Sequence, residues 1–219
     1  MSIRHEVIPF VVASVAIGVA LALILKVCGV AWKPSAISGA ILGCVLTAYM
    51  LYFFRDPHRT PPEDSSLIVA GADGTVMGIV ELAENKYMKC ECVRVSIFLS
   101  LFSVHVNRAP IAGRIKALDY VPGKRFFTFQ EKSSEYNQNN SILIEGKTKC
   151  LVKQIVGPVA RRVIHWLKLE QDVAMGDRIG MMKFGSRLDM YFPKGDVIIL
   201  TKVGDKTAAG ETVIAKMSR

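Results

Sequence analysis

A glycine followed by a serine, Gly185-Ser186, is the pair in this sequence with the most specific chemistry. It lies in the stretch 182–193, whose alternating apolar flanks predict strands. Because Gly185 has no Cβ, the Ser186 hydroxyl could attack its carbonyl carbon and exchange the peptide bond for an ester. Elimination across Ser186 would then cut the chain and leave a dehydroalanine, which loses ammonia to water and becomes a pyruvoyl group. The competing interpretation of the pair is an ordinary turn between two strands.

His105 is the best acid–base candidate among the four histidines. It lies in the run 102–108, where apolar and polar residues alternate, so we expect Ser103, His105 and Asn107 to share one face of a strand. An imidazole held there by hydrogen bonds would still titrate near neutrality, although a structural histidine would show the same pattern. Asp73, between Ala72 and Gly74, is either a turn former or the group that orients a histidine.

Two further groups of residues could bind ligands. Arg108, Arg161 and Arg162 could donate to a phosphate or carboxylate, although two adjacent arginines on a strand face opposite ways. The pair Cys90 and Cys92 has no second cysteine pair or close histidine to complete four ligands, so we predict no metal site. The odd count of five cysteines, without paired spacing, favours a reducing compartment over a disulfide framework.

The amino-terminal part of the chain is unusually apolar. Residues 8–25 and 34–54 carry no charge, and each run is about long enough to cross a bilayer as a helix. A cleaved signal peptide is the alternative for the first run, but its positive region is thin and no small-residue cleavage site follows. The sequence therefore predicts a membrane-anchoring helical hairpin over 1–54. The positive-inside count weakly favours a cytoplasmic location for the remainder of the chain.

The net charge of +9 indicates an anionic partner, either lipid head groups or nucleic acid. The apolar runs favour lipid. The basic residues are scattered rather than gathered on one face, and the sequence contains none of the common nucleic-acid motifs. We therefore expect a membrane partner and no nucleic acid.

A polar, proline-marked linker is predicted over 55–66, followed by a mainly β domain over 67–219 with a β-sandwich or barrel-sandwich architecture. The pattern is one of short apolar runs separated by glycines, which is typical of an all-β domain. The one helix candidate is 125–138. The expected strands are 67–70, 74–81, 93–101, 113–120, 141–145, 151–156, 161–167, 187–192, 197–200 and 212–215.

Several ordered motifs resemble phosphatidylserine decarboxylase proenzymes in their short form. The resemblance runs from Phe53 to Ala215 and centres on the self-processing segment 184–189, Phe-Gly-Ser-Arg-Leu-Asp. The other motifs that carry it, in chain order, are 54–57 (Phe-Arg-Asp-Pro), 72–74 (Ala-Asp-Gly), 104–108 (Val-His-Val-Asn-Arg), 120–124 (Tyr-Val-Pro-Gly-Lys), 154–157 (Gln-Ile-Val-Gly), 160–162 (Ala-Arg-Arg) and 210–212 (Gly-Glu-Thr).

The resemblance implies self-cleavage between Gly185 and Ser186, giving a large chain (1–185) and a small chain (186–219) that stay together as a heterodimer, with higher oligomers an open alternative. The pyruvoyl group derived from Ser186 would form a Schiff base with the amine of phosphatidylserine and accept the electrons left when carbon dioxide departs. Phosphatidylethanolamine would then be released, with no separate cofactor or metal.

The resemblance also assigns roles to individual residues. His105 matches the histidine associated with protonating the decarboxylated intermediate, and Asp73 matches the aspartate associated with self-cleavage. The candidate substrate-binding residues are Arg108, Arg161, Arg162 and Asn137. Arg108 stands where longer relatives carry a second histidine, so a complete Asp-His-Ser relay does not transfer. Ser103 replaces a frequent aspartate, and Gln138-Asn139 replaces an acidic–basic pair.

Two other functions remain open at this point. The same chemistry could act on archaetidylserine, an ether-linked lipid that presents the same head group. A non-catalytic, membrane-tethered β domain that binds anionic lipid would use Gly185-Ser186 only as a turn.

Overall fold

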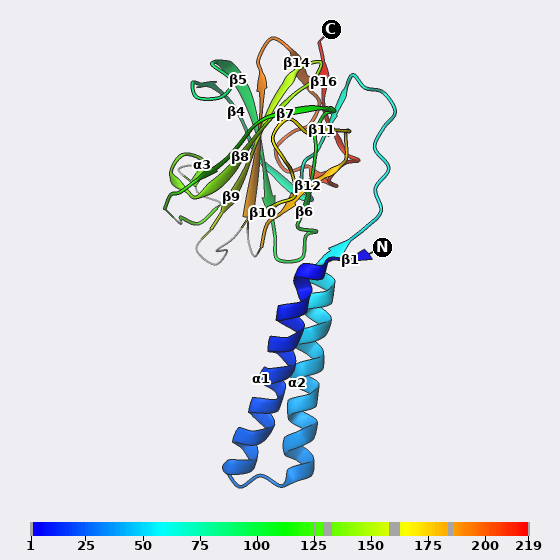
Figure 1. The fold of residues 1–219 in the computed structure, drawn as a ribbon, viewed down its shortest axis with the longest axis vertical. Coiled ribbons are helices and arrows are strands. Elements are labelled where there is room, and N and C mark those ends of the chain that lie inside the picture. The colour runs from blue at the N-terminus through cyan, green and yellow to red at the C-terminus, as the bar shows by residue number, and fades with distance from the viewer. Residues whose placement is uncertain (1, 125, 129–132, 158–162, 184–185, 219) are drawn as a thin grey trace. The chain divides into compact units, whose positions relative to one another are not determined.

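The computed structural model describes residues 2–124, 126–128, 133–157, 163–183 and 186–218. The chain divides into two compact units, 1–58 and 59–219, and the boundary falls inside the linker expected over 55–66. Strands predominate in the second unit, whereas the first is mostly helical (Figure 1). The predicted fold class, a mainly β domain preceded by an apolar helical pair, is therefore confirmed.

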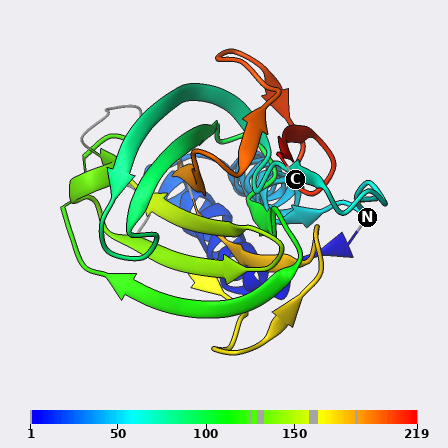
Figure 2. The same cartoon turned by 90° about the horizontal axis from the view of Figure 1, so that it is seen from above.

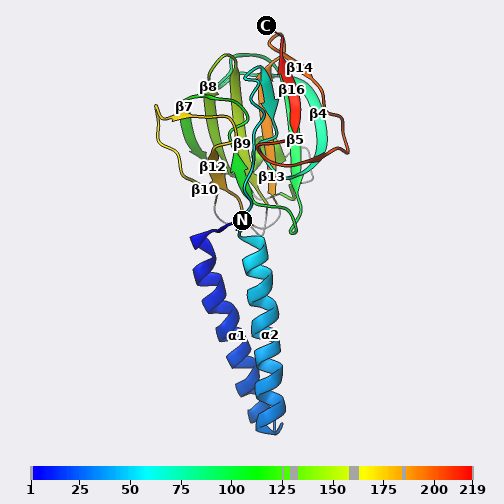
Figure 3. The same ribbon diagram turned by 90° about the vertical axis from the view of Figure 1, so that its right-hand side faces the viewer.

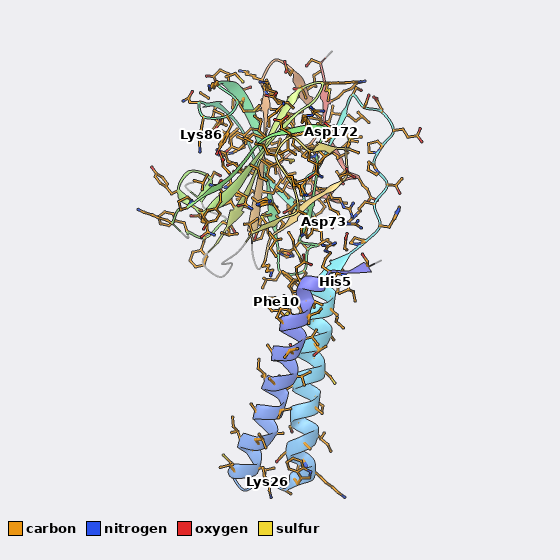
Figure 4. All side chains as sticks on the ribbon, in the orientation of Figure 1. His5, Phe10, Lys26, Asp73, Lys86 and Asp172 are labelled. Atoms are coloured by element: carbon orange, nitrogen blue, oxygen red, sulfur yellow. The ribbon has the colours of Figure 1, made fainter. Side chains whose placement is uncertain are left out.

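The first unit is a pair of long helices, α1 (Ile8–Val27) and α2 (Trp32–Phe53), that run side by side (Figure 3). Both are long and apolar enough to cross a membrane. Figure 4 shows Phe10 and Lys26 near the two ends of α1. A one-turn 3₁₀ helix, η1 (His5–Val7), precedes α1. The short strands β1 (Ser2–Ile3) and β2 (Arg55–Asp56) pair with each other, one before the start of α1 and the other after the end of α2.

The two helices pack through small residues. On each helix the buried small residues recur every four positions, Ser14, Gly18 and Ala22 on α1, and Ser35, Gly39 and Gly43 on α2. A Cβ on Gly39 would overlap the carbonyl oxygen of Gly18. Helices that meet in lipid use such spacing because it lets their backbones approach closely.

The second unit is built on an antiparallel sheet of eight strands in the order β11-β7-β8-β9-β13-β5-β4-β15. The sheet curls strongly, as Figure 2 shows. The curl brings the connection between β4 and β5 next to β7. There the Tyr87 hydroxyl donates a hydrogen bond to Asp119 Oδ2 at 2.9 Å. In chain order the strands are β4 (Gly74–Glu84), β5 (Cys90–Leu99), β7 (Gly113–Val121), β8 (Asn139–Glu145), β9 (Lys149–Val156), β11 (Asp172–Val173), β13 (Ser186–Pro193) and β15 (Lys206–Thr207).

Two smaller sheets complete this unit. One has the order β10-β12-β6, formed by β10 (Ile164–His165), β12 (Arg178–Met181) and β6 (Val106–Arg108). The other has the order β14-β16-β3, formed by β14 (Val197–Ile199), β16 (Val213–Met217) and β3 (Leu67–Val69). Their apolar residues join one face of the large sheet in a single core, to which β13 contributes Leu188, Met190 and Phe192. A short helix, α3 (Ser133–Tyr136), lies within the expected helix candidate.

Candidate functional site

Ser186 is the first residue of β13, a strand inside the large sheet. Its backbone pairs with Leu99 of β5 on one side and with Val156 of β9 on the other. The side chain is fully buried, and its hydroxyl has no hydrogen-bond partner among the residues that the structure describes. An unbonded buried hydroxyl costs about 1–3 kcal/mol. Such a group is a candidate for chemistry, because folding alone gives no reason to keep it there.

Some of the predicted site residues lie outside the described part of the chain. They are Gly185, the partner of Ser186 in the cleavage site, and the two arginines Arg161 and Arg162. Their roles stay predictions from the sequence.

The predicted cleavage site lies where a long two-stranded ribbon is interrupted. β5 pairs with β13 in the large sheet, and β6 pairs with β12 in the smaller one, so the same two chain segments lie together in both sheets. Between the paired positions Ser186–Leu99 and Met181–Val106, the sequence has four residues in one segment (182–185) and six in the other (100–105). The two sheets therefore meet at an interruption of the ladder just before Ser186.

His105 lies on the opposite side of that interruption. Its carbonyl oxygen accepts a hydrogen bond from the Met182 N–H at 3.1 Å, and its side chain is fully buried. From Met182 to Ser186 the chain can extend over at most about 14 Å. On the other strand, His105 follows Leu99, the pairing partner of Ser186, by six positions. Both connections limit how far the His105 backbone can lie from the Ser186 end of the sheet.

The hydrogen bond of the His105 ring fixes its tautomer. Nδ1 lies 2.9 Å from the carbonyl oxygen of Ser103, and a carbonyl can only accept, so Nδ1 carries the hydrogen. In the neutral ring Nε2 then holds the lone pair. The imidazole is therefore oriented to take up or return a proton at Nε2. Ser103 supports His105 through its backbone rather than through its hydroxyl, which bonds Ser100 in the turn before β6.

A buried amide pair joins β6, the strand that begins directly after His105, to β9. Gln154 Nε2 donates to Asn107 Oδ1 at 2.7 Å, and both side chains are fully buried. Gln154 belongs to β9 and pairs with Leu188, so this bond ties β6 directly to the large sheet beside β13. The arrangement stabilises the position of the chain on which His105 sits.

Asp73 immediately precedes β4 at the same end of the large sheet. Gly74 abuts the carbonyl oxygen of Phe98, the residue before Leu99, and a Cβ at Gly74 would overlap that oxygen. Because neighbouring strands are about 4.8 Å apart, Gly74 lies on the order of 10 Å from Ser186, with β5 between them. The structure thus brings Ser186, His105 and Asp73 to one end of the sheet, although they come from three distant parts of the sequence.

The Asp73 carboxylate is held on both oxygens. Oδ1 accepts the N–H of Ala209 at 2.7 Å, and Oδ2 accepts Arg59 Nη2 at 2.7 Å. Arg59 Nη1 in turn donates to Glu211 Oε2 at 2.7 Å, and the Thr60 N–H donates to Glu211 Oε1 at 3.0 Å. These bonds lower the pKa of the Glu211 carboxyl, chiefly through the Arg59 side chain. The sequence motifs had marked Asp73 and Glu211 but had not indicated Arg59, which lies in the predicted linker.

Arg108 and Asn137, two predicted substrate-binding residues, are both buried and bonded to backbone. Arg108 Nη1 donates to the carbonyl oxygen of Gly176 at 2.9 Å. Asn137 Nδ2 donates to the carbonyl oxygens of Phe126 at 2.7 Å and Val156 at 2.9 Å, and its Oδ1 accepts the Phe126 N–H at 2.8 Å. Both amide hydrogens of Asn137 are therefore used to hold the segment before α3 against Val156, the β9 partner of Ser186. We infer that Asn137 positions the wall of the site.

A charged cluster inside the curl of the sheet was not anticipated from the sequence. Arg187 and Asp189 point to the opposite face of β13 from Ser186, and Arg187 Nε donates to Asp189 Oδ1 at 2.7 Å with both side chains buried. Arg187 Nη2 also donates to Ser96 Oγ at 2.8 Å, and the Ser134 hydroxyl of α3 donates to Asp189 Oδ2 at 2.6 Å. Burial raises the pKa of the nearby Tyr191 hydroxyl. The pair fixes β13 directly after Ser186.

Two of the cysteines, Cys92 and Cys150, are buried in the second unit. Burial is the main cause that raises the pKa of the Cys92 thiol to about 12, and it also raises the pKa of the Cys150 thiol. A buried thiol with a raised pKa is a poor nucleophile at physiological pH. Within the described ranges, no three His, Cys, Asp or Glu side chains are grouped so that they could hold a metal ion.

Comparisons with known proteins point to one family. The model of the family described as phosphatidylserine decarboxylase matches residues 46–215. A phosphatidylserine decarboxylase proenzyme of Syntrophus aciditrophicus is 38% identical over 96% of this chain and 95% of its own length. Proteins of the same name from Desulfotalea psychrophila and Pelobacter propionicus are 40% and 42% identical, over 78% and 80% of this chain and 80% of each relative. With these matches over most of its length, the chain is an enzyme that belongs to the phosphatidylserine decarboxylase family.

Proposed function

We propose that this chain is made as a proenzyme, cuts itself between Gly185 and Ser186, and decarboxylates phosphatidylserine to phosphatidylethanolamine. The observation that carries the proposal is the Ser186 hydroxyl, buried and without a partner among the described residues, at the interruption of the β5–β6 and β12–β13 ribbon. The names of the relatives support both the substrate and the existence of a precursor.

The proposed cleavage balances without an external reagent other than water. The Ser186 oxygen forms a bond to the Gly185 carbonyl carbon while the peptide C–N bond breaks, which gives an ester and a free amine. A base then removes the Ser186 Hα, and the Cβ–O bond breaks, releasing residues 1–185 with a carboxylate at Gly185. The dehydroalanine that remains becomes an imine, which water hydrolyses to the pyruvoyl ketone and ammonia. The small chain is then 186–219.

The residues around Ser186 fit a pyruvoyl group. Conversion removes the unbonded hydroxyl, while the backbone of the new first residue stays beside Leu99 and Val156. Once formed, the pyruvoyl group supplies an electrophilic carbonyl that binds the substrate amine and accepts the electron pair released with carbon dioxide. In this proposal His105 returns a proton to the substrate carbon through Nε2, and Asp73 acts in self-cleavage.

The small chain is well held after cleavage. β13 remains paired with β5 and β9, and β16 remains paired with β3. The ion pair from Arg59 to Glu211 also joins the two products. We therefore propose a heterodimer of large and small chains, attached to a membrane through α1 and α2. The side of the membrane on which the second unit lies stays a prediction from the positive-inside count.

Intact-mass measurement of the purified full chain tests the proposal. The expected result is two polypeptides, with the small one lighter by one ammonia than the unmodified fragment 186–219. Ser186→Ala should give a single chain of 24.1 kDa without decarboxylase activity. An unbroken but active wild-type chain, or a small chain that begins with free serine, would contradict the proposal. A single inactive wild-type chain would favour the lipid-binding alternative.

A further inference from the structure

The turn between β5 and β6 exposes two large apolar residues beside the site. Leu101 is 46% exposed and Phe102 is 67% exposed. Three hydrogen bonds hold the turn: Ser103 N–H to the Ser100 carbonyl oxygen at 3.0 Å, Ser100 N–H to Ser103 Oγ at 3.1 Å, and Phe102 N–H to Ser100 Oγ at 3.3 Å. Turns normally carry polar residues at their tips. This turn instead fixes an apolar tip, two positions beyond the pairing partner of Ser186.

A second exposed apolar group lies on the other flank of Ser186. Phe127 is 56% exposed and Tyr136 is 50% exposed. Phe127 directly follows Phe126, whose N–H donates to the Asn137 side chain, and Tyr136 directly precedes Asn137. The same side-chain amide donates to the carbonyl oxygen of Val156. Since Val156 and Leu99 flank Ser186 on its two sides, the apolar residues border the site from both directions. We call Leu101, Phe102, Phe127 and Tyr136 the apolar rim.

Among the described residues of 59–219, most of the exposed aromatic side chains belong to the apolar rim. In the described part of 59–219 they are the three aromatic residues of the rim and Tyr120. Tyr120 is not part of the rim, because it directly follows Asp119, which accepts a hydrogen bond from Tyr87 of the β4–β5 connection. This connection, where Figure 4 labels Lys86, lies at the opposite end of the sheet from Ser186. Exposed aliphatic residues outside the rim, such as Leu169 and Ile198, have no exposed aromatic residue beside them in the sequence.

We propose that the apolar rim inserts into the membrane–water interface and presents the Ser186 site to the head groups of anionic lipid. Exposed Leu and Phe side chains gain by burial at the boundary of head groups and acyl chains, and Tyr prefers the same interface because its ring is apolar and its hydroxyl polar. Lys124 lies 5.8 Å from the Phe126 ring beside the rim, and a cation at this position favours anionic head groups. The inference rests on the proposed function, because it assumes that Ser186 acts on a lipid.

The rim explains a requirement of the reaction. The serine amine and carboxylate of the substrate lie in the head-group layer, so a site that rests on this layer can act while the acyl chains stay in the bilayer. An attached enzyme without such docking would have to lift each lipid out of the membrane. The α1–α2 pair would keep the enzyme at the membrane, and the rim would determine which end of the sheet faces the lipid.

The double variant Leu101→Ser/Phe102→Ser of the full chain tests the role of the rim in catalysis. We expect complete self-cleavage, unchanged activity on a short-chain phosphatidylserine dissolved below its critical micelle concentration, and about tenfold lower kcat/KM on phosphatidylserine in bilayers. The matched control is Leu169→Ser/Ile198→Ser, whose residues are 59% and 56% exposed. It should keep full activity on both substrates. Equal loss on both substrates, or no loss on bilayers, in the first variant would overturn the proposal.

A fluorescence measurement tests insertion independently of activity. Phe102→Trp is placed in a chain whose only two tryptophans, Trp32 and Trp166, are replaced by Phe. In vesicles of phosphatidylcholine and phosphatidylserine brominated near the head of the acyl chains, we expect strong quenching of the new tryptophan. Unquenched emission would refute insertion. So would a change in emission that follows protein concentration alone and not vesicle concentration, because it would show that Phe102 contacts a second copy of the chain. A wild-type chain that neither cuts itself nor decarboxylates short-chain substrate would instead refute the proposed function.

Discussion

Arg59 binds Asp73 through a short ion pair, with Nη2 2.7 Å from Oδ2 and with both side chains largely shielded from solvent. The same guanidinium binds Glu211 through its other terminal nitrogen, also at 2.7 Å. A planar guanidinium can bridge two carboxylates in this fixed geometry, whereas an ammonium cannot. Arg59 therefore connects a residue proposed to act in self-cleavage with the chain that self-cleavage releases.

We predict that Arg59→Gln slows self-cleavage and that Arg59→Lys has an intermediate effect. Without the guanidinium, only the Ala209 N–H would still hold the Asp73 carboxylate among the bonds described above. The measurement is the fraction of cut chain against time after a pulse of synthesis, on denaturing gels. Arg114→Gln is the control, because Arg114 makes a bidentate pair with Asp172 that is largely exposed. Equal rates for wild type and Arg59→Gln would show that Arg59 does not position Asp73.

The Glu211 carboxyl gives a prediction about pH. Its pKa is lowered in the folded protein, chiefly by the hydrogen bond from Arg59, so this interaction stabilises the fold above the unfolded pKa and is lost as the pH falls through the folded one. We expect the urea midpoint of the wild type to fall on acidification from pH 7 towards pH about 4 by more than that of Glu211→Gln. Parallel curves for the two proteins would contradict this assignment.

His105 should be needed for decarboxylation even in chains that have cut themselves. We predict that His105→Asn lowers kcat by about 10²- to 10⁴-fold, because the asparagine amide can replace the Nδ1 donor to Ser103 but offers no base at the position of Nε2. Activity is compared per cut chain, as determined by intact mass. His165→Ala is the control, since His165 is exposed on β10. Near wild-type turnover by His105→Asn would leave His105 a positioning role only.

The sequence predicted the regular elements of this protein well because their patterns are local. The two apolar runs correspond to α1 and α2, and the expected strand 187–192 lies within β13. For the short strands β6 and β12 the local pattern did not give the bounds: alternation indicated a strand over 102–108, of which only 106–108 is strand. They have three and four residues, and each exists only because the other, far away in the chain, pairs with it.

The candidate site was predictable by residue type but not by arrangement. The Gly-Ser pair and the resemblance identified Ser186, His105 and Asp73, yet no pattern could show that Arg59 holds Asp73 across the start of the domain. Arg187 and Asp189 lie on the face of β13 opposite Leu188 and Met190, and nothing in the sequence indicated how this face would be covered. Both are buried, because the sheet curls until this face is also an interior.

The buried pair of Arg187 and Asp189 gives the largest predicted effect on stability. Asp189→Asn should lower the free energy of unfolding by about 3–5 kcal/mol, because it leaves the Arg187 guanidinium buried without its short partner. Arg187→Leu/Asp189→Asn should cost less than the single change, since the Arg187 charge is then gone and only Arg94, 4.0 Å from Asp189 in the wild type, keeps a buried charge there. Denaturant unfolding in a Ser186→Ala background keeps all variants uncut and so comparable.

The matched control for this pair is Asp172→Asn, which removes the carboxylate of the pair with Arg114. The Asp172 side chain is 73% exposed, so solvent already screens the interaction and the change should alter stability by at most about 1 kcal/mol. Similar losses for Asp189→Asn and Asp172→Asn would mean that water reaches the inside of the curl. A large loss for Asp189→Asn alone would show that the strand carrying Ser186 is fixed from behind by a desolvated ion pair, and that this rigidity, rather than any direct contact, is its contribution to the site.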